Sequence, residues 1–314
     1  MPAAVKLCLD CRNIVGESVV WDERAGRLYW VDIVGGTIHA WAPGDAEAHR
    51  FATPTLVTSI GLSAAEGFVV GLKKTVTRWD GAGGFETLAE IEPDLPDNRL
   101  NEGVVGPDGA FWVGTMQNNI APDGAPQEIT ASTGRLYRVL VNGRVEALSE
   151  DRFGITNTLV FTGGRLITAD TLRNELYSYR IEPRAGQLDD KRTILAGFER
   201  GAPDGSCLDA EGFVWTCRVA GGACLIRYAP DGTLDRVVEV PCSWPTSCTF
   251  GGPGLATLYV TSARFTMSPA QLVAAPHEGG LFALDVGVRG RPAYRFGAAP
   301  AGPDLLRIMA HKRR

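Results

Sequence analysis

Four polar residues stand at matching places along the chain, and their side chains could together hold a divalent cation. They are Glu17, Asn101, Asn157 and Asp204. Each opens a short strand-like run that heads one unit of a repeat of roughly 45 residues, and strand-rich repeats of that size indicate a ring of small sheets. Equivalent positions in such a ring point at a common axis. Two carboxylates and two amides gathered there suit a hard divalent ion that keeps positions for water and substrate.

A turn role is the alternative for each of these four residues. Asn and Asp before a strand commonly stabilise turns through their own side chains. Gly16-Glu17 and Pro203-Asp204-Gly205 are both turn-like. The turn role therefore stays open for any one residue, whereas four equivalent positions favour a shared site.

Arg99 lies two positions before Asn101. Side chains two apart share a face of a strand, so an extended segment would point Arg99 and Asn101 the same way and Glu102 away. Arg99 could then donate hydrogen bonds to a substrate hydroxyl or to a developing oxyanion. A salt bridge with Asp97 at the rim is the alternative.

Three further residues could either belong to the site or have a purely structural role. Asp32 and Asp170 end strand-like runs that return toward the same mouth of the ring, so they could support the site or simply stabilise turns. Trp244 lies beside a predicted channel strand and could face a ligand or belong to the core.

The elements that must position these residues are short strands between Gly, Asp and Pro turns. Residues 26–32, 109–114 and 164–170 are three copies of one such strand, rich in β-branched and aromatic residues. A sandwich also has many short strands, but it does not explain the regular recurrence. Six units of four strands predict an all-β fold, a six-bladed β-propeller.

The predicted propeller occupies residues 1–303 as a single domain, followed by a basic tail at 304–314. Residues 5–10 alternate in polarity and precede the first unit, so we expect them to pair within the sixth blade and close the ring. Residues 116–133 form a long polar insertion that we interpret as a lid over one end of the ring.

Composition excludes several classes of function. The net charge of -5 leaves no basic stripe for nucleic acid. No run approaches the roughly 18 apolar residues of a membrane span, and the N-terminus lacks the apolar core of a secretory signal, so we expect a cytoplasmic protein. The seven cysteines are interpreted as reduced and mostly buried. Cys8 and Cys11 form a single Cys-x-x-Cys motif, which lacks the second pair of ligands that a zinc site needs.

Nucleophilic hydrolase motifs are also missing. The four histidines (His39, His49, His277 and His311) fall outside the predicted innermost strands, so a Ser-His-Asp arrangement lacks its base. The sequence contains no Gly-x-Ser-x-Gly elbow and no glycine-rich phosphate loop.

Around the candidate site residues Glu17, Arg99, Asn101, Asn157 and Asp204, the chain closely resembles the SMP-30/gluconolactonase/regucalcin-like family. The resemblance covers residues from about 14 to 295 in order and with similar spacing. The matching segments are Gly16-Glu17 with Trp21, Val31-Asp32-Ile33, 98–103 (NRLNEG), 114–116 (GTM), Thr156-Asn157, Pro203-Asp204-Gly205, 209–212 (DAEG), 246–252 (TSCTFGG), 259–264 (YVTSAR), 278–280 (EGG) and 286–288.

The resemblance implies a six-bladed propeller that holds one divalent metal in the channel mouth and hydrolyses sugar lactones. Glu17, Asn157 and Asp204 match the metal ligands of the family, and Asp204 also matches its general base. Asn101 and Arg99 match residues that contact metal-bound water or substrate.

Two departures lie beside these residues. The family's Gly-Glu-Gly-Pro is here 16–19 (GESV), and its Asn-Gly-Leu is here 157–159 (NTL). The lid carries Gln117, Asn118 and Asn119 where related members have acidic residues, so we expect neutral amides, Asn119 among them, to bind substrate hydroxyls.

We therefore expect a metal-dependent sugar lactonase that acts on aldonolactones as a monomer or weak homo-oligomer. An oxygen-ligand site accepts calcium, magnesium, manganese, iron(II) or zinc. Two alternatives remain open: another metal-dependent esterase of the organophosphate-hydrolase type, which a mostly apolar pocket would favour, and a calcium- or ligand-binding propeller without turnover.

Overall fold

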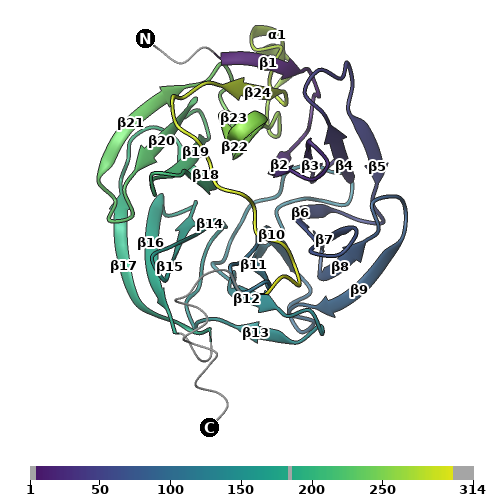
Figure 1. Cartoon of the computed structure of the whole chain (residues 1–314), viewed down its shortest axis with the longest axis vertical. Coiled ribbons are helices and arrows are strands. Elements are labelled where there is room, and N and C mark those ends of the chain that lie inside the picture. Colours follow the sequence, from purple (N-terminus) through teal and green to yellow (C-terminus); the bar gives the residue numbers. More distant parts are fainter. Residues whose placement is uncertain (1–4, 183–185, 300–314) are drawn as a thin grey trace.

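The protein is a ring of six antiparallel sheets arranged about a common axis (Figure 1). A computed structural model describes residues 5–182 and 186–299, and the predicted basic tail at 304–314 lies outside these described residues. Each sheet has four strands, and the order within a sheet follows the chain except in the sixth. The predicted six-bladed β-propeller is therefore confirmed.

The first three blades contain strands that follow one another directly in the sequence. Blade one is β2 (Gly16–Asp22), β3 (Arg27–Asp32), β4 (Thr37–Trp41) and β5 (His49–Ala52). Blade two is β6 (Val57–Leu62), β7 (Phe68–Leu72), β8 (Thr75–Trp79) and β9 (Phe85–Glu90). Blade three is β10 (Asn98–Val105), β11 (Phe111–Gln117), β12 (Leu136–Val139) and β13 (Val145–Ala147).

The last three blades complete the ring. Blade four is β14 (Thr156–Thr162), β15 (Arg165–Asp170), β16 (Glu175–Ile181) and β17 (Leu188–Ala196). Blade five is β18 (Ala202–Leu208), β19 (Val214–Val219), β20 (Cys224–Tyr228) and β21 (Leu234–Glu239). Blade six is β22 (Pro245–Gly251), β23 (Thr257–Ser262), β24 (Leu281–Leu284) and β1 (Val5–Leu9), with the short helices η1 (Pro253–Leu255) and α1 (Pro269–Ala274) beside it.

The ring closes in blade six, where the first and the last strands of the described chain pair in one sheet. β1 pairs antiparallel with β24, with Val5 opposite Leu284, and becomes the outer strand of blade six. The prediction for residues 5–10 is confirmed, with the strand ending at Leu9. This pairing leaves no open seam between the first and last blades.

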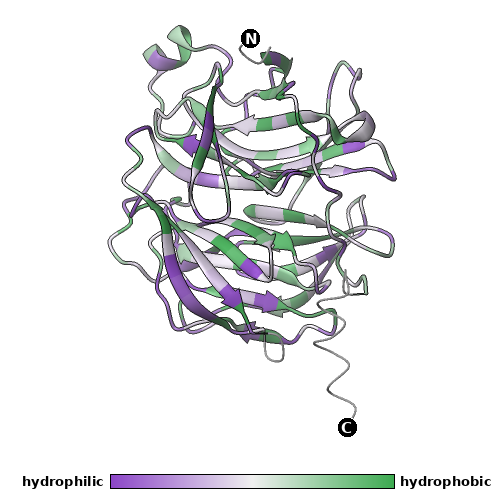
Figure 2. Cartoon of the chain, turned by 60° about the vertical axis from the view of Figure 1, so that its left-hand side comes forward, coloured by the Kyte–Doolittle hydropathy of each residue, from purple (hydrophilic) through white to green (hydrophobic). Residues whose placement is uncertain are grey.

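The core lies within and between the blades rather than in the channel. Hydrophobic and hydrophilic residues alternate along several strands (Figure 2), as expected where one face of a strand packs against the next blade. Trp30, Trp79, Trp112 and Trp215 are almost fully buried, because their side chains fill the spaces between neighbouring sheets. The outer strand of blade five, β21, is mostly exposed. In the part of the chain that the structure describes, no helix is long and apolar enough to cross a membrane.

Candidate metal and substrate site

All six sequence-predicted site residues line one pocket of about 450 Å³. They are Glu17, Arg99, Asn101, Asn119, Asn157 and Asp204. The pocket lies at the end of the channel where the innermost strands begin, because five of these strands (β2, β10, β14, β18 and β22) each contribute lining residues. The expected convergence of these side chains is what the structure shows.

A β-bulge lies directly after the predicted metal ligands Glu17 and Asn157, and a third bulge spans Asp204. The register of the innermost strand shifts between Glu17 and Val20, between Asn157 and Val160, and between Pro203 and Ser206. Bulges bend a strand and re-aim its side chains, and they occur often beside functional sites. The repeated bulge explains how residues in otherwise regular strands present their side chains along the channel axis.

Two bulges contain a residue with left-handed backbone where the resembled family has glycine. Ser18 has a φ of 53° and Thr158 a φ of 56°. This conformation costs a residue with a Cβ atom roughly 1–2 kcal/mol. The Ser18 hydroxyl accepts a hydrogen bond from Ile60 N at 2.9 Å, and the Thr158 hydroxyl donates to the Asp204 carbonyl at 2.6 Å. These contacts offset the strain and connect neighbouring innermost strands, so both departures are structurally accommodated.

The two carboxyl groups of the pocket are buried beside each other. Glu17 and Asp204 are each 7% exposed. Burial raises the pKa of Glu17 to about 7, although the Ser18 amide, Asp204 and Arg99 oppose the shift. Burial, together with the negative charges of Glu17 and Glu102, raises the pKa of Asp204 well above its ordinary value. Two such groups need either a shared proton or a cation.

The chemistry of these donors fits a divalent ion. A bound cation would offset the repulsion between Glu17 and Asp204, and the Asn157 amide oxygen would add a neutral ligand. Among the described residues, no group of three or more His, Cys, Asp or Glu side chains is arranged to hold a metal. Any metal site here therefore depends on two carboxylates with amide oxygens and on ligands from outside the chain.

A chain of hydrogen bonds crosses the pocket floor from blade three to blade five. Arg99 donates from Nη2 to Asn119 Oδ1 at 2.8 Å and from Nη1 to Asn101 Oδ1 at 2.7 Å. Asn101 Nδ2 donates to Asn157 Oδ1 at 3.2 Å, and Asn157 Nδ2 donates to Thr171 Oγ1 at 2.8 Å. Thr171 in turn donates to the Pro203 carbonyl at 2.8 Å. The network fixes the orientation of both amides at the pocket floor.

Arg99 is a buried group of this pocket. It is 4% exposed, and within the described chain it forms no salt bridge, so the alternative of a rim pair with Asp97 is wrong. Burial lowers the pKa of Arg99 to about 10, and the nearby Glu17 charge opposes the shift. The Nε atom of Arg99 has no hydrogen-bond partner among the described residues.

Asp32 and Asp170 stabilise turns, and the turns they stabilise lead into the site. Asp32 accepts hydrogen bonds from the backbone amides of Ile14 and Val15, both at 2.9 Å, just before Glu17. Asp170 accepts from Gly154 N at 2.9 Å, just before β14 and Asn157. Both interpretations therefore hold: the two carboxylates stabilise turns, and these turns help to position the pocket.

The lid prediction holds only for part of its residues. Met116 and Gln117 belong to strand β11, so the loop begins later than predicted. The Gln117 amide accepts hydrogen bonds from Thr130 N and Ala131 N, and Asn118 bonds the Ile120 backbone, so both amides are used inside the loop. Asn119 does line the pocket.

Several lining residues were not singled out from the sequence. Thr171 and Gln127 add polar groups, and the pocket wall is largely apolar: Ile33, Ile120, Leu172, Val219 and Phe265. Thr171 could have been found from its place directly after Asp170. Trp244 also lines the pocket, which favours the ligand-facing interpretation. Glu102, as expected, faces away and lines a second cavity.

Comparisons with known proteins agree with this architecture. The chain is 34% identical over 296 residues to the 6-deoxy-6-sulfogluconolactonase of Pseudomonas putida, covering 92% of this chain and 97% of that protein. It is 31% identical over 301 residues to the L-arabinolactonase of Azospirillum brasilense, covering 94% and 96%. The structure of a calcium-binding protein, regucalcin, from Agrobacterium tumefaciens matches with a TM-score of 0.86 at 28% identity, covering 95% of this chain and 99% of that one.

The sequence profile of one family spans most of the propeller. It is described as the SMP-30/Gluconolactonase/LRE-like region, and it matches residues 15–264. The matched segment contains every predicted site residue from Glu17 to Asp204. The chain therefore belongs to the SMP-30/gluconolactonase/LRE-like family.

Proposed function

We propose that this protein hydrolyses sugar lactones to the corresponding acids with the help of a divalent metal ion held by Glu17, Asn157 and Asp204. The observation that carries the proposal is the buried pair of carboxyl groups in a pocket lined by amides and one arginine. Relatives named as lactonases support lactone hydrolysis. The calcium-binding relative supports a divalent ion, whose identity among calcium, zinc, iron(II), manganese and magnesium is left to experiment.

In this mechanism each residue has a defined task. A bound divalent ion supplies Lewis acidity for the lactone carbonyl and stabilises negative charge on its oxygen. Asp204, which would also help to hold the ion, would take the proton of the attacking water and return it to the ring oxygen as the ring opens. Asn101 and Asn157 are held by their hydrogen bonds to each other and to Thr171, so their oxygens need no reorientation.

Arg99 and Asn119 form hydrogen bonds with the hydroxyl groups of the substrate. Their direct hydrogen bond at 2.8 Å fixes both side chains at the pocket wall. Both side chains line the pocket, where a guanidinium and an amide suit neutral oxygen groups. Gln127 adds a further amide from the loop after β11. Neutral polar groups with one fixed cation favour an uncharged polyol ring.

The apolar wall favours a second candidate function, hydrolysis of esters or lactones that carry an apolar group. Ile33, Leu172, Val219 and Phe265 surround the polar floor, and Trp244 lies beside them. A volume of about 450 Å³ is within the range of pockets that take drug-sized ligands. A substrate larger and less polar than a single sugar ring would use this wall.

A lactone panel tests both candidates. Acid release is measured with aldonolactones, alkyl-substituted lactones and aryl esters, after chelation and after restoring each divalent ion singly. We expect aldonolactones to be turned over most efficiently and chelation to abolish the reaction. Faster turnover of the apolar substrates would replace the sugar assignment with the esterase, and full activity after chelation would reject the metal mechanism.

A further inference from the structure

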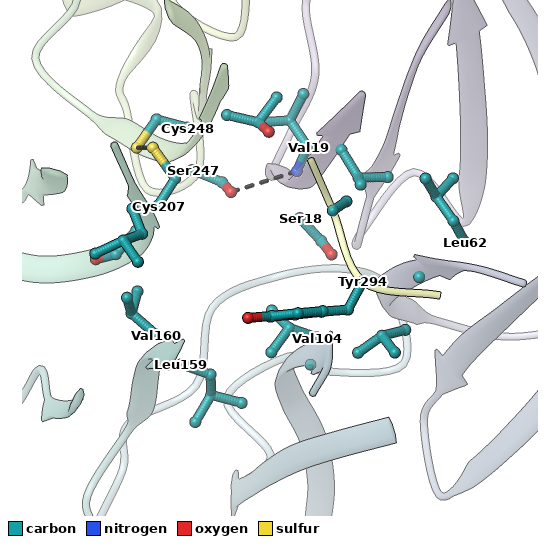
Figure 3. A pocket seen from close by; sticks show the side chains of 18 of the residues that line it. Ser18, Val19, Leu62, Val104, Leu159, Val160, Cys207, Ser247, Cys248 and Tyr294 are labelled. Carbon is teal, nitrogen blue, oxygen red and sulfur yellow. Dashed lines mark hydrogen bonds between the residues drawn. The ribbon is translucent and has the colours of Figure 1, made fainter. Parts of the chain in front are cut away.

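A second cavity lies at the opposite end of the channel, where the innermost strands end. It has a volume of about 170 Å³, and its lining includes Glu102, Cys207, Ser247, Cys248 and Tyr294 (Figure 3). No residue to which we assign a role in lactone hydrolysis lines it. The two sulfur atoms of Cys207 and Cys248 face each other at its wall.

A strap from the end of the described chain crosses this mouth of the channel, after β24 (Figure 1). Gly290 N donates to Leu255 O at 2.8 Å on one side, and Phe296 N donates to Leu62 O at 2.8 Å on the other. Tyr294 lies between these anchors at the cavity and is 39% exposed. A cavity of about 170 Å³ has room for small solutes such as hydrogen peroxide, whereas a folded protein cannot enter it.

The two thiols belong to neighbouring blades and are already close. Cys207 Sγ lies 3.6 Å from Cys248 Sγ, on β18 and β22 respectively. Cys248 donates its S–H to the Trp215 carbonyl at 3.6 Å, and its sulfur accepts from both Cys207 and Cys217. Cys207 is partly exposed, whereas Cys248 is 2% exposed. The third nearby thiol, Cys217, is fully buried and does not line the cavity.

We propose that Cys207 and Cys248 form a peroxide-sensitive dithiol that closes to a disulfide beneath the strap. One of the two sulfurs attacks hydrogen peroxide and becomes a sulfenic acid, with release of one water. The other sulfur then attacks the sulfenic sulfur, expels the second water and forms the S–S bond. Both sulfurs are oxidised by one electron each, and both peroxide oxygens are reduced to water.

The disulfide would act on the first pocket through the strands that carry it. An S–S bond is about 2.05 Å long, so the sulfurs must approach by roughly 1.5 Å. Asp204 lies three residues before Cys207 on β18, and Thr246 on β22 bonds the Gly16 carbonyl beside Glu17. The strands that carry Asp204 and Glu17, β18 and β2, are therefore both connected to the proposed disulfide. A displacement of about 1 Å in a catalytic group can cost on the order of a hundredfold in rate.

The test is peroxide treatment of the folded full-length protein, followed by non-reducing peptide mapping. We expect a linkage between the peptides containing Cys207 and Cys248, reversed by dithiothreitol. The linkage should be lost in Cys207→Ser and kept in Cys217→Ser, the matched control within the same blade. Oxidation confined to Cys8 and Cys11, or a Cys217 to Cys248 linkage, would overturn the assignment even if a serine variant failed to fold, because the wild-type map suffices.

The coupling is tested on the same samples. Lactone turnover of the oxidised wild type should fall by on the order of tenfold or more and recover with dithiothreitol, whereas treated Cys207→Ser keeps its activity. A mapped disulfide with unchanged turnover would overturn the coupling. The peptide map does not depend on the proposed lactonase activity, so a failure of that function remains distinguishable from a failure of the dithiol.

Discussion

Glu17→Gln is expected to stabilise the ion-free protein at alkaline pH while removing its response to divalent ions. The pKa of Glu17 is raised from 4.5 to about 7, chiefly by burial. Between these two values the folded state holds a proton that the unfolded state has lost. Stability is therefore lost as the pH rises through this window, and the loss is complete above about pH 7.

The magnitude follows from the size of this shift. One pKa unit corresponds to roughly 1.4 kcal/mol, so Glu17 alone removes about 3 kcal/mol from the free energy of unfolding across the window. The neighbouring carboxyl of Asp204 changes in the same direction, because its pKa is also raised. Glutamine has a similar shape and no ionisation, so the variant avoids this penalty. It also removes one of the two charges that would attract a cation.

The assay is urea unfolding of wild type and Glu17→Gln in chelator, at about pH 5 and about pH 8. Wild type should lose most of the 3 kcal/mol between these conditions, and the variant clearly less. Adding calcium or manganese at alkaline pH should stabilise wild type and leave the variant unchanged, because only a ligand that binds the native state shifts the equilibrium. Glu47→Gln, at an exposed position, is the control. Equal pH slopes in wild type and Glu17→Gln would refute the reasoning.

The remaining predictions concern single side chains of the pocket. Asp204→Asn should retain metal, measured by elemental analysis, and lower turnover by about 10²–10⁴-fold, since the proton acceptor is lost; undiminished turnover would reject that role. Asn119→Ala should change the ranking among aldonolactones in the acid-release assay without changing metal content, and an unchanged ranking would contradict its contact with substrate. Thr158→Val removes the hydroxyl bonded to the Asp204 carbonyl at 2.6 Å and to Ser206 at 2.9 Å, so urea unfolding should show a loss of about 1–3 kcal/mol. Thr158→Ser, which keeps the hydroxyl, should lose much less.

The sequence determined the fold and most of the pocket because both depend on a repeat. Short strands at regular spacing with Pro-Asp-Gly turns are sufficient to predict six blades, and the closing strand follows from the alternation of residues 5–10. Glu17, Asn157 and Asp204 could be placed together because equivalent positions of a ring share one axis. Arg99 followed from the two-residue period of a strand. These are properties of local pattern and symmetry.

Long-range packing determines which groups face one another. The bulges after Glu17 and Asn157, and the left-handed backbone at Ser18 and Thr158, depend on contacts with the neighbouring blade. Residues of the lid carry the same kind of amide, yet the fold of the loop turns Gln117 inward on the loop itself and leaves Asn119 in the pocket. Cys207 and Cys248, 41 residues apart, meet only because blades five and six are adjacent. Long-range packing selects among side chains that local pattern leaves equivalent, and this selection sets the chemistry of both cavities.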